Sequence, residues 1–378
     1  MFQLTNEQEM VRLMARDFAK RELEPFAGER DEQERFPVEV IRKMGNLGLM
    51  GMMVPPEYGG SGAGAVSYSL ALQEIAYACA STAVTMSVAN LSTEPLLKFG
   101  SEAQKQRHLL SLAGGETLGA FAITEPDSGS DPGSMKTRAE DRGDHYLVNG
   151  TKVFITNGGY ADVINLIVRT DPQKGNRGLS ALVVEKGTPG FHVGKKEKKM
   201  GLRASDTVEL LFDDCKIAKE NLLGRKGQGF KVAMTALDSG RIGIASQSLG
   251  IARACLDEAV KYAQTRKQFG KVISSFQAIQ WMVADMATQI EAAHWLVLAA
   301  ADRKDRGLSF TKEASMAKLF ASELANRAAY KALQIHGGYG YMAEYKIERL
   351  YREARVTAIY EGTSEIQRIV IARECMET

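Results

Sequence analysis

Apolar and polar residues alternate with a helical period through the first third of the chain. Thr5 with Gln8, and Ser101 with Gln104, have the spacing of capping boxes that open helices. Apolar residues follow the first box at spacings of three and four, which gives this helix an apolar face: Met10, Leu13, Met14 and Phe18. One loop rich in Pro and Gly interrupts the helical signals. The pattern predicts an α-helical domain over residues 1–117.

The pattern changes near Gly119, where short apolar runs replace the helical period. The runs at 145–148 and 151–155 flank Asn149-Gly150, a pair that is typical of a two-residue hairpin turn. Further runs with strand character follow at 163–168, 182–184 and 208–212. Several short strands at close spacing predict a small β-sandwich or barrel over residues 118–225.

Helical periodicity returns after Gly227. An apolar face predicts one long helix near 281–301, and after a break at Gly307 a second long helix runs from about 311 to 335. Long helices with short connections predict an antiparallel four-helix bundle over residues 226–378. The predicted fold class is therefore α+β multidomain, in the order α, β, α. A Rossmann fold is not expected, because no Gly-x-Gly-x-x-Gly motif joins a strand to a helix.

Composition and charge exclude several classes of function. The chain has 378 residues and a formal net charge of +2, so nothing favours binding to nucleic acid or to a membrane surface. Asp285 and Glu291 lie within the apolar helix near 281–301, so no membrane span is expected. The cysteines are scattered and no histidine has a partner at metal-ligand spacing, so neither a disulfide framework nor a metal site is expected.

The same features give an expectation for localisation. The start of the chain lacks the basic and apolar regions of a signal peptide, and the scattered cysteines fit a reducing compartment. We expect the cytoplasm for a bacterial protein, or the mitochondrial matrix for a mature eukaryotic one.

The strongest candidate for chemistry is Glu361. Ser364 and Gln367 have the spacing of a capping box, which places Glu361 on a loop just ahead of a helix N-terminus. Gly362 beside it allows the backbone to approach a ligand closely. A carboxylate in this setting can act as a general base over an anionic or carbonyl ligand. The alternative is an ordinary solvated glutamate in a capped loop.

Two further stretches place polar groups at strand ends. Phe121–Asp131 is predicted to be a strand that enters a loop rich in hydroxyls, carboxylates and Gly, which can hold a polar ring edge or a carbonyl. In Phe154–Gly158, an aromatic ring and a hydroxyl two residues apart share a strand face that can support a flat ring. The alternatives are an ordinary turn and a core Phe beside a turn.

Three motifs on helices are less specific on their own. Arg266 follows a helix, and Arg suits bidentate contact with phosphate, although many Arg at helix ends hold no ligand. Paired glycines end a long helix at Gln334–Gly338, where they can be simple C-caps. Asp238 and Arg241 lie three apart on one helix, so a local ion pair is the alternative to ligand binding.

Taken together and in this order, the motifs resemble those of the acyl-CoA dehydrogenases over nearly the whole chain. The run Tyr360–Thr363 is similar to the segment that carries the base of that family, which implies Glu361 in this role. The resemblance implies the fold of that family, FAD as cofactor and an acyl-CoA thioester as substrate. Glu361 would remove the α proton while a hydride passes to FAD, giving the 2-enoyl-CoA. Electrons would then leave to an electron transfer flavoprotein.

The resemblance also implies which residues meet each ligand. The substrate contacts are Ser130, Asp238, Arg241 and Gly362. The FAD contacts are Phe121, Ile123, Thr124, Ser130, Phe154, Thr156, Arg266, Gln268, Phe269, Gln277, Gln334, His336, Gly337, Gly338, Thr363 and Glu365. In that family, contacts equivalent to Arg266, Gln268 and Phe269 reach the cofactor of a neighbouring subunit. This implies at least a homodimer, and a dimer of dimers as the usual form.

Two positions differ from the common pattern of the family. Phe154 stands where the family usually has Trp, which keeps a stacking surface but removes the indole N–H donor. Some members carry the base at the position of Gly240, and Gly cannot serve as a base, so Glu361 is the better candidate.

The acyl group is not fixed by the sequence. No Arg lies between Met86 and Leu97, which disfavours a dicarboxylic acyl group. The depth of the pocket depends on packing around Leu91, Ser92 and Pro95, and short straight, branched and cyclic acyl groups all stay open.

Other functions also remain open. A flavin oxidase of the same fold would form peroxide rapidly from oxygen. A non-enzymatic flavin-bound protein would bind a partner, and the intact Glu361 and the small net charge weigh against it. A helical scaffold without cofactor is the least specific alternative, which a visible spectrum would identify.

Overall fold

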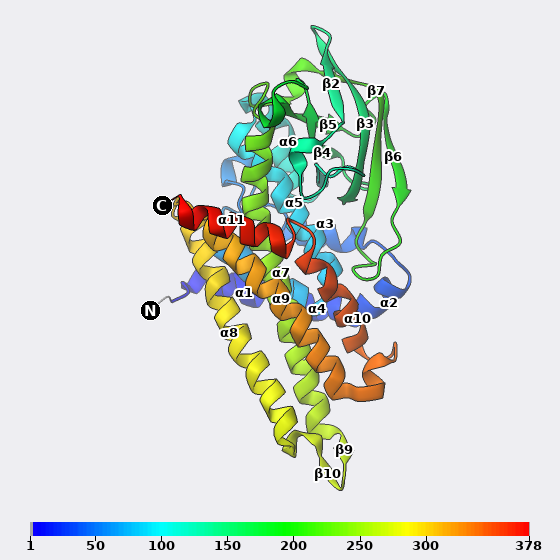
Figure 1. Ribbon diagram of the computed structural model, residues 1–378, viewed down its shortest axis with the longest axis vertical. Helices are drawn as coiled ribbons and strands as arrows, with labels where there is room; N and C mark the ends of the chain where they lie inside the picture. The colour runs from blue at the N-terminus through cyan, green and yellow to red at the C-terminus, as the bar shows by residue number, and fades with distance from the viewer. Residues whose placement is uncertain (1–2, 378) are drawn as a thin grey trace.

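The computed structural model describes residues 3–377 and shows an N-terminal helical region, a sheet and a C-terminal helical region (Figure 1). The N-terminal helices are α1 (Asn6–Phe18), α2 (Ala27–Glu32), α3 (Val38–Asn46), α4 (Gly64–Ala78), α5 (Ala80–Phe99) and α6 (Glu102–Ala113). The capping boxes Thr5/Gln8 and Ser101/Gln104 are confirmed, because each side chain bonds to the other residue's backbone N–H. Helices α4 and α5 are buried along nearly their whole length, so they form the centre of the molecule.

One hydrogen-bonded sheet makes up the middle of the chain. Its strands are β1 (Gly119–Ala122), β2 (Arg138–Asp141), β3 (His145–Thr156), β4 (Val163–Arg169), β5 (Leu179–Glu185), β6 (Phe191–Lys196), β7 (Thr207–Ala218) and β8 (Leu222–Leu223). The order is β6-β7-β3-β2-β4-β5-β8, and β1 pairs in parallel with β4. The inward side chains of β3, β4 and β7 pack with β5 into an apolar core of their own.

The hairpin predicted at Asn149-Gly150 is wrong. Strand β3 continues through both residues, with a register shift against β7 between Val148 and Gly150. The Asn149 amide receives a bond from the Asp214 backbone N–H at 2.9 Å and donates to the Asp214 carboxylate at 3.0 Å. Asn149 therefore bonds across to the neighbouring strand, and the pair that favours a tight turn here forms a bulge.

The C-terminal helices pack against the buried pair α4 and α5. They are α7 (Gly229–Thr265), α8 (Gln277–Asp305), α9 (Thr311–His336), α10 (Lys346–Arg355) and α11 (Ser364–Met376). The two long helices predicted near 281–301 and 311–335 are confirmed as α8 and α9. A two-stranded hairpin, β9 (Lys267–Gln268) with β10 (Lys271–Val272), connects α7 to α8. The main apolar cluster joins α7, α8 and α9 to residues of α4 and α5.

Helix α5 connects the sheet to the helical regions. The Asn157 side chain, after β3, donates to the Thr85 carbonyl at 3.2 Å, and Asn165 of β4 donates to the Ser92 carbonyl at 2.7 Å. Both amides are buried, so these bonds fix the sheet against α5. Groups on the sheet edge and groups facing α5 from α7 are thus held in one frame. No helix within residues 3–377 is long and apolar enough to cross a bilayer.

Candidate active site

Glu361 lies in the short turn between α10 and α11. Its φ is 55°, in the left-handed region that non-Gly residues rarely adopt, and Gly362 follows with φ 90°. The capping box predicted from Ser364 and Gln367 is wrong by one residue. Thr363 is the N-cap, and its hydroxyl accepts from the Ile366 backbone N–H, while Ser364 is the first residue of α11. The prediction that Glu361 precedes a helix N-terminus is nevertheless confirmed.

The Glu361 carboxyl packs against helix α7 at Gly240. A Cβ at Gly240 would lie 2.4 Å from Glu361 Oε2 and 2.5 Å from Leu91 Cδ1, so the space beside Gly240 is already filled. Glu361 Oε2 is buried and has no hydrogen-bond partner within residues 3–377. Burial raises the pKa of Glu361 to about 7, although the charges of Arg241 and Lys318 act in the opposite direction. The sequence alternative, a solvated glutamate, is therefore wrong.

Arg241 lies beneath this carboxyl and pairs with Asp238. Arg241 is 4% exposed, and its guanidinium lies 2.5 Å from the Asp238 carboxylate, so the local ion pair weighed from the sequence is present. Asp238 also accepts from the Thr311 hydroxyl at 2.7 Å, and burial raises the pKa of Asp238. The Arg241 Nε atom is buried without a partner within the described chain. The pair holds a positive charge near Glu361 while Asp238 offsets part of it.

Two side chains bond to the Glu361 turn, Lys318 and Gln367. Sequence reasoning missed Lys318 and assigned Gln367 to a capping box. Lys318 of α9 donates to the Gly362 carbonyl at 2.7 Å. Gln367 of α11 donates to the same carbonyl at 2.9 Å and to the Glu361 carbonyl at 3.0 Å. A signal for Lys318 exists in the sequence, because it falls on the apolar stripe of Ala314 and Ala321. A lysine at such a position needs a buried partner.

The predicted strand-end residues Phe121, Ile123 and Thr124 lie together at the edge of the sheet. Phe121 belongs to β1, and the Thr124 carbonyl accepts from the Val153 backbone N–H of β3 at 2.9 Å. Lys152 of β3 is fully buried, and its ammonium donates to the Ile123 carbonyl at 2.9 Å.

A buried ion pair fixes this edge. Lys152 Nζ lies 2.8 Å from Glu125 Oε1, and Glu125 also accepts from the backbone N–H groups of Lys136 and Thr137. Burial lowers the pKa of Lys152 to about 8, and the Glu125 charge acts against that shift. Glu125 begins the loop that contains Ser130, and Lys136 and Thr137 end it. The Glu125 carboxylate therefore connects both ends of this loop to Lys152 of β3.

Phe154 and Thr156 stand on the less buried side of β3. Phe154 is 64% exposed and has φ 60°, while Ile155 between them is 2% exposed. An exposed aromatic side chain on a strained backbone is unusual for a strand interior and fits a surface that supports a ligand. Ser130 is exposed in the loop that follows β1.

The remaining predicted FAD contacts gather at the far ends of α7 and α9. A pocket of about 550 Å³ is lined by Arg266, Gln268, His336, Gly337 and Gly338, together with Tyr262 and Tyr339. The Arg266 guanidinium lies over the Tyr339 ring at 5.2 Å, and the Tyr262 and His336 rings stack at 4.3 Å. Gln277 and Gln334 are exposed nearby, and Phe269 at the hairpin tip is 93% exposed.

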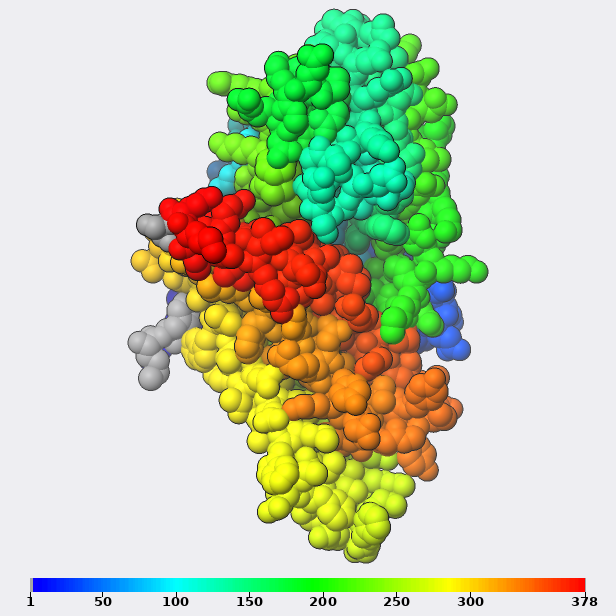
Figure 2. Space-filling view, in the orientation of Figure 1, coloured from blue at the N-terminus to red at the C-terminus, as the bar shows by residue number. Residues whose placement is uncertain are grey.

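These residues form two separate groups within one chain. Figure 1 shows the β9–β10 hairpin at the opposite end of the molecule from the sheet, with the start of α11 between them. Figure 2 shows a recess where the surface of the sheet meets that of the C-terminal segment. Within the described chain, the Arg266 pocket therefore lies apart from both the Glu361 turn and the strand-end residues.

Comparison with known proteins agrees with this geometry. Residues 5–116, 120–215 and 227–376 match the N-terminal, middle and C-terminal domains of acyl-CoA dehydrogenases. An acyl-CoA dehydrogenase of Bacillus subtilis (strain 168) is 53% identical over 371 residues, 98% of each chain. The chain belongs to the acyl-CoA dehydrogenase family. It is accordingly a flavin-dependent oxidoreductase, and the fold class predicted from its sequence is confirmed.

Two other similar proteins have more specific names. The solved butyryl-CoA dehydrogenase of Megasphaera elsdenii is 45% identical with a TM-score of 0.98, and the match covers 100% of both chains. An acryloyl-CoA reductase (NADH) of Anaerotignum propionicum is 50% identical over 100% of this chain and 96% of its own.

The residues of this acyl-CoA dehydrogenase family member fit a bound flavin nucleotide. Gly337 and Gly338 have nothing within 4 Å of an added Cβ, so the backbone beside Arg266 is open to a ligand. Arg provides the fork of donors that phosphate accepts, and the exposed Phe154 provides a face for a planar ring.

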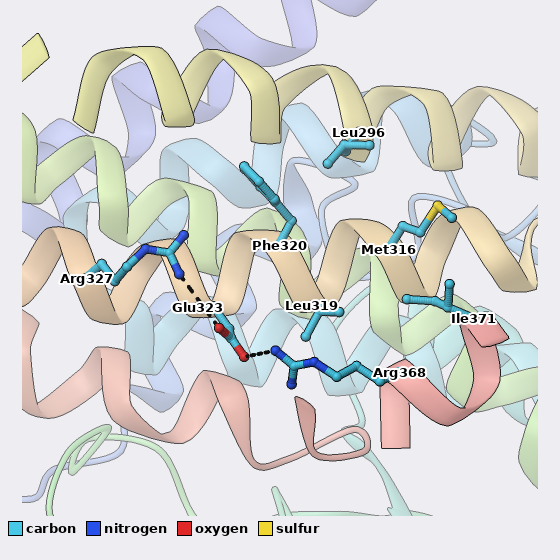
Figure 3. A pocket seen from close by; sticks show the side chains of 8 residues that line it. All are labelled: Leu296, Met316, Leu319, Phe320, Glu323, Arg327, Arg368 and Ile371. Atoms are coloured by element: carbon cyan, nitrogen blue, oxygen red, sulfur yellow. Dashed lines mark hydrogen bonds and ion pairs between the residues drawn. The ribbon is translucent and has the colours of Figure 1, made fainter. Parts of the chain in front are cut away.

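The same family member carries an open apolar groove between α8, α9 and α11. The groove has a volume of about 400 Å³, and Figure 3 shows its apolar side chains facing one another: Leu296, Met316, Leu319, Phe320 and Ile371. At its rim, Glu323 pairs with Arg368 at 2.9 Å and with Arg327 at 3.7 Å (Figure 3). The groove lies on the outer side of α9, away from the Lys318 contact with the Glu361 turn.

Proposed function

We propose that this protein converts a short acyl-CoA thioester to its 2-enoyl-CoA, with Glu361 as the base, FAD as the cofactor and an electron transfer flavoprotein as the acceptor. The observation that carries the proposal is the Glu361 carboxyl, whose buried Oε2 has no hydrogen-bond partner within the described chain and whose pKa burial raises to about 7. A base whose pKa lies near neutral pH is suited to proton abstraction.

Glu361 would take the proton from the carbon next to the thioester carbonyl. Negative charge then develops on the carbonyl oxygen and needs a donor. The backbone N–H of Glu361 makes no hydrogen bond within residues 3–377, so it is available for this oxygen. The left-handed turn at Glu361 presents the side chain and the N–H from one residue.

FAD would supply the acceptor for the hydride from the β carbon, because protein side chains cannot. Phe121, Ile123, Thr124, Phe154 and Thr156 would hold its ring system, and Ser130, Thr363 and Glu365 would contact it beside the Glu361 turn. Arg266, Gln268, Phe269, Gln277, Gln334, His336, Gly337 and Gly338 would hold its phosphates and adenine side. Burial of the site keeps water from the reacting atoms.

The acyl group is proposed to be short. One turn beyond Gly240, a Cβ at Gly243 would lie 2.4 Å from the Ser87 hydroxyl and 2.6 Å from the Tyr68 hydroxyl. These two buried hydroxyls bond to each other at 3.2 Å and limit the room beside α7. The similarity to a butyryl-CoA dehydrogenase supports the same substrate class.

The active unit is proposed to be at least a homodimer, and a dimer of dimers by resemblance to the family. Support comes from the position of the Arg266 pocket, which lies too far along α7 and α9 to complete the Glu361 site of its own chain. The apolar groove with ion pairs at its rim has the composition of a contact between protein surfaces.

A second candidate is the reverse reaction, reduction of an enoyl-CoA. The 50% identity to an acryloyl-CoA reductase (NADH) favours it, and a pKa near 7 allows Glu361 to donate a proton as well as accept one. If this direction operates, the protein should form propionyl-CoA when it is supplied with acryloyl-CoA, NADH and electron transfer flavoprotein.

Glu361→Gln tests the proposed base. The variant should keep bound flavin and its yellow colour, while bleaching of the flavin by butyryl-CoA slows by roughly 10²–10⁴-fold. Stopped-flow absorbance under anaerobic conditions measures the rate. Glu353→Gln is a matched control, because Glu353 of α10 is 1% exposed and burial also raises its pKa to about 7. Bleaching of Glu361→Gln at the wild-type rate would exclude Glu361 as the base.

A further inference from the structure

Lys318 is fully buried in the middle of α9, between the alanines that pack this helix against its neighbours. Its ammonium forms no ion pair within 4.0 Å among residues 3–377, and its one hydrogen bond goes to the Gly362 carbonyl. Burying an ammonium group without a close carboxylate is energetically unfavourable. A lysine kept here against that cost therefore points to a role at the turn that it contacts.

The turn itself needs support. Glu361 at φ 55° and Gly362 at φ 90° are two successive residues in the left-handed region, which is an unfavourable conformation for the non-Gly residue. Lys318 from α9 and Gln367 from α11 hold the carbonyls of this turn from two sides. The direction of the Glu361 side chain depends on this backbone conformation.

The charged and titratable groups around Glu361 come from several helices. Arg241 of α7 and Lys318 of α9 are the cations that lower the pKa of its carboxyl, and Asp238 neutralises part of the Arg241 charge. The Tyr68 hydroxyl of α4 and the neighbouring Tyr360 both have their pKa raised further by the Glu361 charge. Burial lowers the pKa of Lys318 to about 7, and the charges of Glu361 and of Glu365 of α11 act against that shift.

We propose that Lys318 is a positioning residue for the base: its hydrogen bond to the Gly362 carbonyl holds the Glu361 turn, and its protonated form stabilises the carboxylate form of Glu361. The catalytic part of this inference rests on the proposed function, whereas the electrostatic part does not. The electrostatic part predicts that removing the Lys318 charge changes the pKa of Glu361. The positioning part predicts that removing the hydrogen-bond donor slows the reaction, so the two parts can be measured separately.

Two variants separate the parts. Lys318→Met removes the charge and the donor but keeps an unbranched chain, and Lys318→Gln removes the charge while keeping an N–H donor. Lys331→Met is the control, because Lys331 lies on the same helix, half-buried, and pairs at 2.8 Å with Asp285 away from the turn. Near-ultraviolet circular dichroism checks that each variant folds, and Lys318→Gln remains informative if Lys318→Met does not.

The first readout does not depend on turnover. Difference infrared spectroscopy, with Glu361→Gln in each background as reference, follows the titration of the Glu361 carboxyl. Loss of the buried charge should raise its apparent pKa by about one unit or more in both Lys318 variants and leave it unchanged in Lys331→Met. An unchanged titration in both Lys318 variants would overturn the electrostatic part, even if the wild-type protein proves inactive with acyl-CoA.

The second readout is the rate of flavin bleaching by butyryl-CoA at a pH where Glu361 is ionised in every variant. Lys318→Met should slow bleaching by at least about tenfold, because the base is no longer held in place, and Lys318→Gln should stay within about threefold of wild type. Equal rates for wild type and Lys318→Met would overturn the positioning part. Wild-type protein that does not bleach at all refutes the proposed function and, with it, the positioning part, while the titration alone decides the electrostatic part.

Discussion

At the scale of single residues, the site depends on Gly240, which has no side chain. Gly240 leaves room on α7 for the Glu361 carboxyl, and any Cβ there would meet Glu361 Oε2 at 2.4 Å. The sequence shows a glycine within a helix but not what occupies the space beside it. The structure supplies the reason for the glycine, which is the buried acid packed against it.

The pKa of Glu361 predicts how activity depends on pH. Burial raises this pKa to about 7 in the folded protein, so the carboxyl is protonated below that pH and cannot act as a base. The value of kcat/KM for butyryl-CoA should rise about tenfold per pH unit up to about pH 7 and then level off. Steady-state assays between pH 5 and 9 measure this, and a flat profile across pH 7 would contradict the proposed ionisation.

The same ionisation has the opposite effect on stability. The folded pKa lies above the ordinary value of 4.5, so the contribution of Glu361 to folding is fully present below pH 4.5 and is lost as the pH rises through about 7. Activity and stability therefore change in opposite directions across this interval.

Sequence reasoning reached Glu361, Asp238 and Arg241 but not Lys318 as a group at the site. The resemblance of Tyr360–Thr363 to a known segment led to Glu361, and the spacing of Asp238 and Arg241 led to their ion pair. Lys318 does not stand out in the sequence, because a single lysine in a helix is usually solvated. Its position on an alanine stripe was the available signal, and only the packing of α9 against the turn shows its partner.

At the scale of secondary-structure elements, the helices were easier to predict than the sheet. The long apolar faces of α8 and α9 fix their lengths, and two N-terminal capping boxes were located correctly. The hairpin prediction at Asn149-Gly150 is wrong because pairing of β3 with β7 along the length of β3 overrides the local preference for a turn. Which strands pair is decided by contacts far apart in the chain, and a local pattern carries little information on them.

Gly150 gives a prediction at this scale. Its φ is 148°, and a Cβ would lie 2.5 Å from the Thr137 hydroxyl and 2.7 Å from Thr137 Cα, so Gly150→Ala should lower the free energy of unfolding by about 2–4 kcal/mol. Urea unfolding followed by circular dichroism measures the change.

Gly143→Ala is the matched control for this prediction, because Gly143 also has a positive φ, of 94°, but nothing lies within 4 Å of an added Cβ. Its loss should be confined to backbone strain, roughly 1 kcal/mol. Equal losses in the two variants would show that crowding against Thr137 is not the cause.

At the scale of the whole molecule, the helix–sheet–helix order is predictable from the pattern of residues, whereas the dimer follows only from the resemblance to the family. Changes of periodicity marked the three regions, although their boundaries stay predictions. The periodicity does not show how the cofactor site is assembled, whereas the structure places the Arg266 pocket at the far ends of α7 and α9, away from the start of α11 (Figure 1). Completion of the site by a second copy is therefore part of the proposal.

A complementation experiment tests this arrangement. Arg266→Ala and Glu361→Gln each damage one part of the site, so each variant alone should show little activity with butyryl-CoA. Chains that assemble at random after coexpression should recover about a quarter of wild-type activity, because half of the dimers are mixed and each has one intact site. Differently tagged chains allow mixed dimers to be purified and assayed, and mixed dimers without activity would place both residues in the same chain's site.

The exposed hairpin with Phe269 at its tip has a broader consequence. If the hairpin of each chain contacts the nucleotide bound to its neighbour, activity depends on the concentration of subunits. On dilution the oligomer would dissociate, and the enzyme would lose activity although every subunit remained folded. The two equilibria are then linked. If association of the subunits raises the affinity for the nucleotide by some factor, bound nucleotide must raise the affinity of the subunits for each other by the same factor. Availability of flavin would in this way govern how much of the enzyme is assembled.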